Sequence, residues 1–393
     1  MQGFFASSTV QQEKPVGLVP RCGACGLLKG CQSPKMKPYG KGRQGVLVVG
    51  EAPGKTEDEE GRPFIGKAGE FLRDTLDDLG IDLDRDALTT NALICRPPGN
   101  KIQDPRQIDY CRPNLINTIN EFKPRVIVTL GGSALHSVLA PYWKDDIGPL
   151  ERWTGWTIPL EQHWVCPTYH PSYLLRMKNP LLDKLFKKHL ERAFNIEDDT
   201  PARPDLSKEV EIIYDDREAA EAILEMGRAG GFVAVDYETN CLKPEWPRAQ
   251  IYSCALSNKH QTISYPWVGS AIGATGGFLQ SDRTRKIASN IKMEERWTLK
   301  NFGWGVTNWN WDTMLAAHCL DNREGITSIK FQAFVKLGIP TYNANIEPYL
   351  FSSKNSPYNR IQEIEMKDLL LYGGVDAFAE REVAILQMKE MGL

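Results

Sequence analysis

The sequence contains no apolar run that approaches the ~20 residues needed for a membrane-spanning helix. Its first residues lack the basic and then apolar pattern of a secretory signal. Internal repeats and low-complexity tracts are also absent. These absences predict a protein of the cytoplasm, or a viral protein in the cytoplasm of its host, with no membrane partner.

Neither sign of charge dominates, because 47 lysines and arginines stand against 50 aspartates and glutamates, for a net charge of −3. The chain as a whole is therefore no polycation, and any contact with nucleic acid has to come from local basic patches. Its 393 residues, 41% of them hydrophobic, are enough for two or three domains with a core each.

Nine cysteines in a chain without a secretory signal favour metal or cluster ligation over disulfides. Cys22 and Cys25 form a C-x2-C pair, and Cys95 and Cys111 lie further along the chain. Four such thiolates suit either a tetrahedral zinc ion or a [4Fe–4S] cluster, and their spacing does not decide between the two. Cys31 is an alternative to Cys25 as a ligand. Core packing is expected for the remaining cysteines, Cys166, Cys241, Cys254 and Cys319.

Short apolar runs at 45–49, 125–130 and 164–166 each lead into a loop, and residues 66–80 have helical spacing. This alternation predicts an α/β fold with a parallel sheet, whose functional residues lie on loops at the carboxyl ends of the strands. The acidic, proline-containing segment 197–209 is the predicted linker. It would separate a domain at 18–196, preceded by a tail at 1–17, from a second domain at 210–393.

Three motifs follow one another in the first domain: GEAPG and GRPFIGKAG within 50–69, TN and CRPP within 90–98, and HPSYLLR at 170–176. Together with the four cysteines they resemble the family-4, iron–sulfur uracil-DNA glycosylases, over roughly residues 18–195. The resemblance implies a parallel-sheet sandwich of the uracil-DNA glycosylase type. It also implies excision of uracil from DNA and a [4Fe–4S] cluster on Cys22, Cys25, Cys95 and Cys111.

The motif residues have the chemistry that uracil excision needs. A glycosylase turns uracil out of the helix, which costs a few kcal/mol, and reads it in a tight pocket. Phe64 offers a stacking face, and the amide of Asn91 matches N3–H and O4 of uracil, where cytosine presents the opposite pattern. His170 is expected to hydrogen-bond O2 as negative charge builds on the departing base.

The remaining predicted contacts surround the base. Glu51 and Glu57 are the candidates for holding the water and favouring the cationic sugar, and the family resemblance favours Glu51. Leu174 and Arg176 are predicted to fill the gap that the base leaves in the helix. Gly50 and Ser172 complete the predicted substrate contacts.

In the second domain, Asp236 and Glu238 share one face of a predicted strand end, because side chains alternate with period two. This D-x-E and the later Y-x3-D of Tyr372 and Asp376 resemble the first and third motifs of the 3′–5′ proofreading exonucleases of DNA polymerase I. Residues 286–294 correspond to the second motif, but Glu294 stands where the family has aspartate. Asp312 is the alternative for this position.

That resemblance implies a ribonuclease H-like domain of the DEDD type. Two Mg²⁺ or Mn²⁺ ions would be held by Asp236, Glu238, Glu294 and Asp376, and Tyr372 would orient the attacking water. The whole chain is then a DNA-processing enzyme with two activities. The alternative is the exonuclease or DNA-binding subunit of a split viral DNA polymerase, with one site idle, that works beside a separate polymerase chain.

Overall fold

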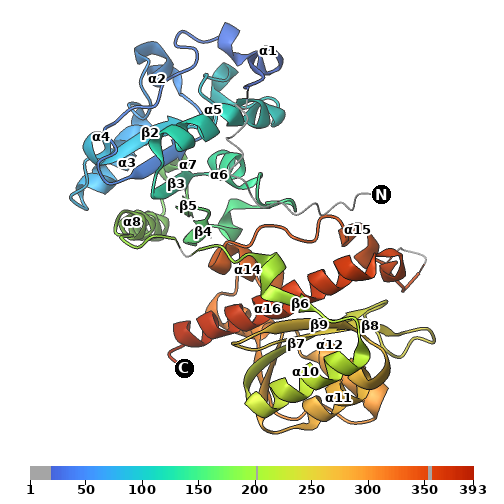
Figure 1. Cartoon of the computed structure of the whole chain (residues 1–393). Helices are drawn as coiled ribbons and strands as arrows, with labels where there is room; N and C mark the ends of the chain where they lie inside the picture. The colour runs from blue at the N-terminus through green and yellow to red at the C-terminus, as the bar shows by residue number, and fades with distance from the viewer. Residues whose placement is uncertain (1–18, 201, 353–355) are drawn as a thin grey trace. The chain divides into compact units, whose positions relative to one another are not determined.

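The computed structural model describes residues 19–200, 202–352 and 356–393, which form two compact units (Figure 1). The N-terminal unit consists of the described residues up to Pro141 together with Ile147–Thr200. The C-terminal unit consists of Tyr142–Asp146 and the described residues after Thr200. The predicted tail at 1–17 lies outside the described residues. Across the described part of the chain, none of the helices has the length and apolarity to cross a membrane.

The N-terminal unit is built on a five-stranded sheet in the order β2-β1-β3-β5-β4. Its strands are β1 (Val46–Gly50), β2 (Ala87–Asn91), β3 (Val126–Leu130), β4 (Ile158–Leu160) and β5 (His163–Thr168). All neighbours are parallel except β4, which runs antiparallel to β5. Every residue of β1 and β3 is buried, as expected for strands covered on both faces. The predicted parallel sheet is confirmed.

The helices of this unit cover both faces of the sheet. They are α1 (Cys22–Cys25), α2 (Lys55–Glu60), α3 (Lys67–Asp77), α4 (Leu83–Asp86), α5 (Arg106–Phe122), α6 (Gly132–Leu139), α7 (Pro171–Met177) and α8 (Pro180–Phe194). Short 3₁₀ turns occupy Leu27–Lys29, Pro98–Asn100 and Leu150–Arg152. In the main core, Leu72 and Leu76 of α3 and Phe186 of α8 pack against Val46 and Val48 of β1.

The C-terminal unit has a six-stranded sheet in the order β11-β10-β7-β8-β9-β6. Its strands are β6 (Val210–Ile212), β7 (Gly231–Thr239), β8 (Ile251–Ser257), β9 (Thr262–Pro266), β10 (Thr284–Ala288) and β11 (Trp309–Asp312). Strands β7, β8 and β9 form an antiparallel meander, and β10 and β11 run parallel to β7. This is the topology of a ribonuclease H-like domain, with β6 added at the edge, and it confirms the predicted fold class.

The helices of the C-terminal unit lie on opposite faces of its sheet, with α16 on one face and α10 and α11 on the other (Figure 1). They are α9 (Leu206–Glu209), α10 (Asp216–Ala229), α11 (Gly269–Gln280), α12 (Lys292–Phe302), α13 (Thr313–Leu320), α14 (Ile329–Leu337), α15 (Glu347–Leu350) and α16 (Met366–Glu390), with a 3₁₀ turn at Ile361–Glu363. Val233, Val235 and Tyr237 of β7 pack in the core with α10, α11 and α12. The period of two then turns Asp236 and Glu238 toward α16.

Two segments differ from the predicted domain plan. Residues 206–209 of the expected linker form helix α9. Residues 142–146, expected in the first domain, belong to the C-terminal unit. The physical reason for the second difference is aromatic packing, because the ring of Trp143 lies 5.1 Å from that of Phe334 and 6.0 Å from that of Phe331.

Candidate active sites and the cysteine pocket

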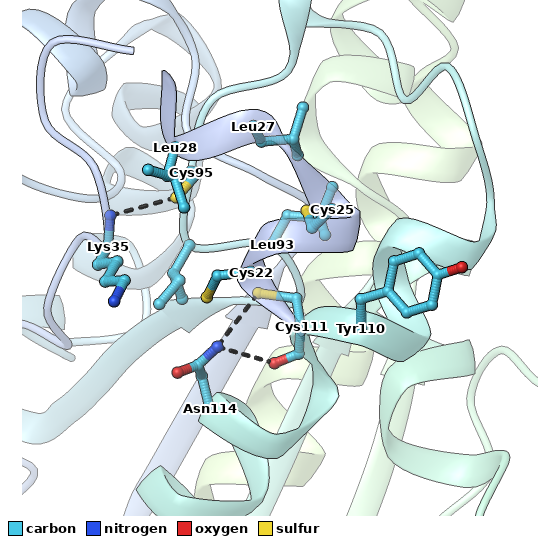
Figure 2. Close-up of a pocket in the computed structure, with 11 residues that line it drawn as sticks. Cys22, Cys25, Leu27, Leu28, Lys35, Leu93, Cys95, Tyr110, Cys111 and Asn114 are labelled. Atoms are coloured by element: carbon cyan, nitrogen blue, oxygen red, sulfur yellow. Dashed lines mark hydrogen bonds between the residues drawn. The ribbon is translucent and has the colours of Figure 1, made fainter. Parts of the chain in front are cut away.

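The four predicted cysteine ligands line one pocket, which Figure 2 shows. Cys22 and Cys25 come from α1, Cys95 from the loop after β2, and Cys111 from α5. Helix α1 is held on α5 by the side-chain amide of Gln107, which donates to the carbonyl oxygen of Cys25 at 3.1 Å. All nine cysteines are free thiols.

The surroundings of this pocket suit a group that binds thiolates. The lining is otherwise largely apolar, and burial raises the pKa of Cys95 to about 12 and the pKa of Cys111 above its ordinary value. Two donors oppose this effect: the backbone N–H of Lys35 reaches Cys95 Sγ at 3.2 Å, and the amide of Asn114 reaches Cys111 Sγ at 3.5 Å (Figure 2). Four sulfur ligands with hydrogen-bond donors to two of them fit a [4Fe–4S] cluster.

Cys31, the alternative ligand, takes a different position. It packs in the same small cluster as Cys95 and acts electrostatically on it, but it does not line the pocket. Its thiol lies 3.8 Å from the carbonyl oxygen of Leu28. The geometry therefore favours Cys25 over Cys31 as the fourth ligand.

A second pocket, of about 370 Å³, opens at the carboxyl edge of the N-terminal sheet. It gathers residues that lie up to 121 positions apart in the sequence, from Glu51 to Ser172. Predicted residues that line it are Glu51, Glu57, Phe64, Asn91, His170 and Ser172. The sheet explains the convergence, because parallel strands β1, β2, β3 and β5 all end at this edge.

Gly50 lets the side chains of Asn91 and Phe64 approach the sheet. It pairs with Asn91 in the register of β1 and β2. A Cβ atom at Gly50 would lie 2.5 Å from Asn91 Oδ1 and 2.8 Å from Phe64 Cζ. Phe64 itself has a φ of 56°, the left-handed region that bulky residues rarely adopt. Its ring is therefore held in place by the surrounding loop at some cost in backbone strain.

The hydrogen bonds of His170 determine its tautomer. At the start of α7 its Nδ1 accepts from the backbone N–H of Ser172 at 3.2 Å and lies 2.8 Å from the Ser172 hydroxyl. Burial lowers the pKa of His170, and the charge of Arg176 lowers it further, against the opposing carboxylates of Glu51 and Glu57. The neutral ring thus accepts at Nδ1 and carries its proton on Nε2, which leaves Nε2–H as its donor.

The two glutamates on the first loop have different partners. Glu51 Oε2 accepts from the hydroxyl of Ser133 at 2.8 Å, a contact that orients its carboxylate. Glu57 Oε1 accepts from the backbone N–H of Gly66 at 2.8 Å and so ties α2 to the start of α3. The next residue, Asp58, is buried and accepts from the backbone N–H groups of Gln32 and Ser33. Asp58 therefore joins the pocket loop to the segment that follows α1, and Glu57 joins it to α3.

The structure corrects one predicted contact. Leu174 is 2% exposed and packs in the main core of the unit, so it is not available to enter a DNA helix without leaving that core, and the wedge predicted there is wrong. The exposed apolar side chains of α7 are Leu175 and Met177, at 38% and 51%. Arg176 is exposed and donates to the Ser172 hydroxyl at 3.3 Å.

In the C-terminal unit, Asp236, Glu238 and Asp376 each place a carboxylate oxygen so that all three oxygens lie within 4.8 Å of one another. Burial raises the pKa of each, and the neighbouring carboxylates raise those of Asp236 and Glu238 further. The three carboxylates come together because helix α16 lies close to β7. A Cβ atom at Gly373 of α16 would lie only 3.2 Å from Glu238 Cγ. Asp236 Oδ2 is buried without a hydrogen-bond partner among the described residues. A divalent cation fits such an oxygen-rich site.

Three further side chains surround Asp376. The hydroxyl of Tyr342 donates to Asp376 Oδ1, and Tyr372 also hydrogen-bonds this carboxylate. The ammonium of Lys330 lies 5.3 Å from the centre of the Tyr372 ring, and its charge lowers the pKa of all three carboxylates. Tyr372 thus lies beside the carboxylates and shares Asp376 with a second tyrosine.

The two candidates for the second-motif position, Glu294 and Asp312, have different surroundings. Glu294, in the first turn of α12, is 4% exposed, and the charge of Asp236 acts on it. Asp312 accepts four backbone N–H groups, from Asn290 and Ile291 and from the first turn of α13. Because both its oxygens are engaged in this way, Asp312 acts as a helix cap. Glu294, by contrast, has a pKa that is raised by burial and by the charge of Asp236.

Comparisons with known proteins match the N-terminal part of the chain to one family. Residues 37–194 match the model of the uracil DNA glycosylase superfamily. The type-4 uracil-DNA glycosylase of Pyrobaculum aerophilum is 35% identical over 180 residues, which cover 45% of this chain and 90% of the relative. The chain belongs to the type-4 uracil-DNA glycosylases.

Similarity extends beyond the part that this family shares. The DNA polymerase of Bacillus phage SP01 is 25% identical over 335 residues, covering 76% of this type-4 glycosylase and 35% of the polymerase. Among solved structures, the exonuclease domain of Aedes aegypti Nibbler matches 49% of this chain and 95% of its own, with 13% identity and a TM-score of 0.36.

The sequence analysis did not identify several residues that lie beside the candidate sites of this type-4 glycosylase. Ser133, Lys330 and Tyr342 lie far along the chain from the groups they contact and belong to no motif. Glu380 is different, because it lies one helical turn after Asp376, on the same face of α16. That i, i+4 spacing was a signal that the sequence already contained.

Proposed function

We propose that the N-terminal unit removes uracil from DNA by hydrolysis of the N-glycosidic bond. The observation that carries this proposal is the single pocket that combines the amide of Asn91, the ring of Phe64, the Nε2–H of His170 and the carboxylate of Glu51. We further propose that Cys22, Cys25, Cys95 and Cys111 hold a [4Fe–4S] cluster, which would bind α1, α5 and the loop after β2 into one structure.

The proposed reaction divides the work among these side chains. Phe64 stacks on the flipped uracil while Asn91 accepts from N3–H and donates to O4. As the bond between N1 and C1′ breaks, the electron pair moves into the base, and Nε2–H of His170 donates to O2. Glu51 stabilises the cationic sugar and accepts a proton from the water that adds to C1′.

The hydrogen bonds around these groups support their roles. Ser133 holds one oxygen of Glu51, and the backbone N–H of Gly66 holds one oxygen of Glu57, so each carboxylate keeps a second oxygen for water. We assign the water to Glu51, the residue that the family resemblance favours. Arg176 donates to Ser172, which lies against His170 Nδ1, so the proposed DNA-facing arginine is connected to the histidine through one hydroxyl.

For the C-terminal unit we propose hydrolysis of DNA from the 3′ end. Two Mg²⁺ or Mn²⁺ ions, when bound by Asp236, Glu238, Asp376 and Glu294, would supply Lewis acidity at the terminal phosphodiester. Tyr372 is proposed to orient the water, while Lys330 adds positive charge beside the carboxylates.

A groove of about 650 Å³ on the same unit supports binding of a single strand. Asn240, which follows β7, belongs to its lining, so the groove begins near the carboxylates. The guanidinium of Arg248 lies 4.9 Å from the ring centre of Tyr358, and that of Arg360 lies 4.9 Å from the ring centre of Tyr349. Arginines and aromatic rings of this kind bind phosphates and stacked bases.

One assay tests both proposals. Purified protein is incubated with an end-labelled single strand that carries one uracil, with and without EDTA. Uracil release should survive EDTA, and shortening from the 3′ end should not. Asp376→Asn should abolish only the shortening, and Asp368→Asn, on the same helix outside the carboxylate group, is the matched control. Release of uracil only with added metal would refute the glycosylase mechanism.

The similarity to the phage polymerase favours one partner. We propose that a separate DNA polymerase chain works beside this protein and passes mismatched 3′ ends to it. Addition of the protein to a polymerase from the same source should increase removal of 3′ mismatches, and Asp236→Ala should lose this gain. An unchanged error rate, with no binding between the two, would leave a free-standing repair enzyme as the function.

A further inference from the structure

Glu380 is a buried carboxylate that none of the sequence motifs includes. It lies on α16 one turn beyond Asp376 and is 3% exposed. Its Oε1 accepts from the backbone N–H of Ser289, at the end of β10, over 3.1 Å. Its Oε2 is buried and has no hydrogen-bond partner among the described residues. A charged oxygen that is buried without a partner destabilises the folded chain unless a cation or a proton compensates it.

Two other carboxylate oxygens of the C-terminal unit share this condition. Asp236 Oδ2 and Glu294 Oε2 are also buried without partners in the described chain. The carboxylates of Glu380, Glu294 and Asp236 are electrostatic neighbours, and Asp376 also acts on Glu380. The three come from α16, from the first turn of α12 and from β7, and the charges of Asp236 and Glu294 both act on Glu380.

The charge of Lys330 acts on the Asp236, Glu238 and Asp376 group but is not among the main influences on Glu294 and Glu380. The charged groups that act most strongly on Glu294 and Glu380 are carboxylates. Acidic groups collected in a buried place need a cation or protons between them, and hard oxygen ligands suit Mg²⁺ or Mn²⁺.

We propose that Glu380 is a ligand of the second divalent ion, together with Glu294 and Asp236. Asp236 would then be shared between this ion and the first one, which lies among Asp236, Glu238 and Asp376. The inference rests on the nuclease function proposed above. It adds a fifth carboxylate to that site, and this carboxylate reaches the second ion from the same helix that supplies Asp376.

A simpler role for Glu380 would be to cap the backbone N–H of Ser289. Glu380→Gln separates the two roles, because the amide oxygen keeps this hydrogen bond while the charge and one metal-binding oxygen are lost. Glu390→Gln is the matched control, because Glu390 lies on the same helix, is largely exposed and forms an ion pair with Lys336 at 2.5 Å.

The experiment measures binding of Mn²⁺ to the full chain by electron paramagnetic resonance, which counts free ion during a titration. Wild type and Glu390→Gln should bind two ions per chain. Glu380→Gln should keep the first ion and bind the second more weakly by at least the roughly 10- to 100-fold that loss of an outer-shell partner costs. Thermal unfolding without metal checks that all three proteins fold alike.

The outcomes distinguish this inference from the proposed function. If wild type binds no Mn²⁺, the nuclease proposal itself fails. If wild type and Glu380→Gln bind two ions with equal affinity, the nuclease proposal stands and the role of Glu380 is refuted. Loss of both ions together with a lower unfolding temperature would assign Glu380 to the structure of the unit, and would also refute the role as ligand.

Discussion

Gly50→Ala is the change that most directly tests the uracil pocket. The new methyl group would lie 2.5 Å from Asn91 Oδ1 and 2.8 Å from Phe64 Cζ, both well inside ordinary contact distance. Because Gly50 ends a buried strand in the middle of the sheet, its backbone is not free to move away. The two side chains have to move, and they are the groups proposed to read and stack the base.

The expected magnitude follows from this displacement. Relief of both contacts needs shifts of up to about 1 Å, and a misplacement of this size typically lowers the rate about 100-fold, which corresponds to about 2.7 kcal/mol in the barrier. The stability of the unit should fall by a smaller amount, about 1–3 kcal/mol for an overpacked site. The cluster and the C-terminal unit lie outside the affected contacts and should be unchanged.

The assay is single-turnover release of uracil from a labelled strand, followed beside the visible absorbance of the cluster and the 3′ nuclease activity. Gly132→Ala is the matched control, because a Cβ there meets nothing within 4 Å. Wild-type uracil release by a folded Gly50→Ala protein would refute the assignment of Asn91 and Phe64 to the base. A loss of nuclease activity of equal size would point to a global defect instead.

Four further tests concern the uracil pocket, the cysteine pocket and the carboxylates of the C-terminal unit. Asn91→Asp should reduce uracil release, because its carboxylate repels O4, and should open weak release of cytosine; unchanged uracil release would remove Asn91 from recognition. Burial lowers the pKa of His170 below the ordinary 6.5, so the neutral ring should persist at pH 7 and release should decline only as the pH falls through that lowered pKa. The same group should lower the free energy of unfolding at acid pH. The unfolded chain takes up the proton first, so stability falls as the pH drops below about 6.5. Acid unfolding measures this loss. Cys95→Ser should lose the brown colour of the cluster and solubility together, and stoichiometric zinc without iron in anaerobically purified wild type would contradict the cluster. Gly373→Ala should weaken Mn²⁺ binding and nuclease activity with uracil release intact, because the added Cβ lies 3.2 Å from Glu238 Cγ; equal metal affinity would show that the helix yields at this point.

From the sequence alone it was possible to predict which residues belong to each candidate site. Alternation along β7 placed Asp236 and Glu238 on one face, because the period of a strand is a local property. The apolar runs indicated a parallel sheet, and the loops after its strands contained Glu51, Asn91 and His170. These assignments depend on residues that are close in the chain or at the ends of predictable strands, and so they needed no knowledge of long-range packing.

Only the tertiary structure shows the contacts that residues make with partners far away in the sequence. Leu174 has the same apolar character as Leu175, and only the packing of α7 shows that the first is buried and the second exposed. Asp312 and Glu294 were both acceptable carboxylates until the backbone N–H groups around Asp312 accounted for its oxygens. Ser133 and Glu380 acquire their neighbours only when separate strands and helices meet. Burial and hydrogen-bond satisfaction are properties of the folded chain, and they separate residues that are chemically alike in the sequence.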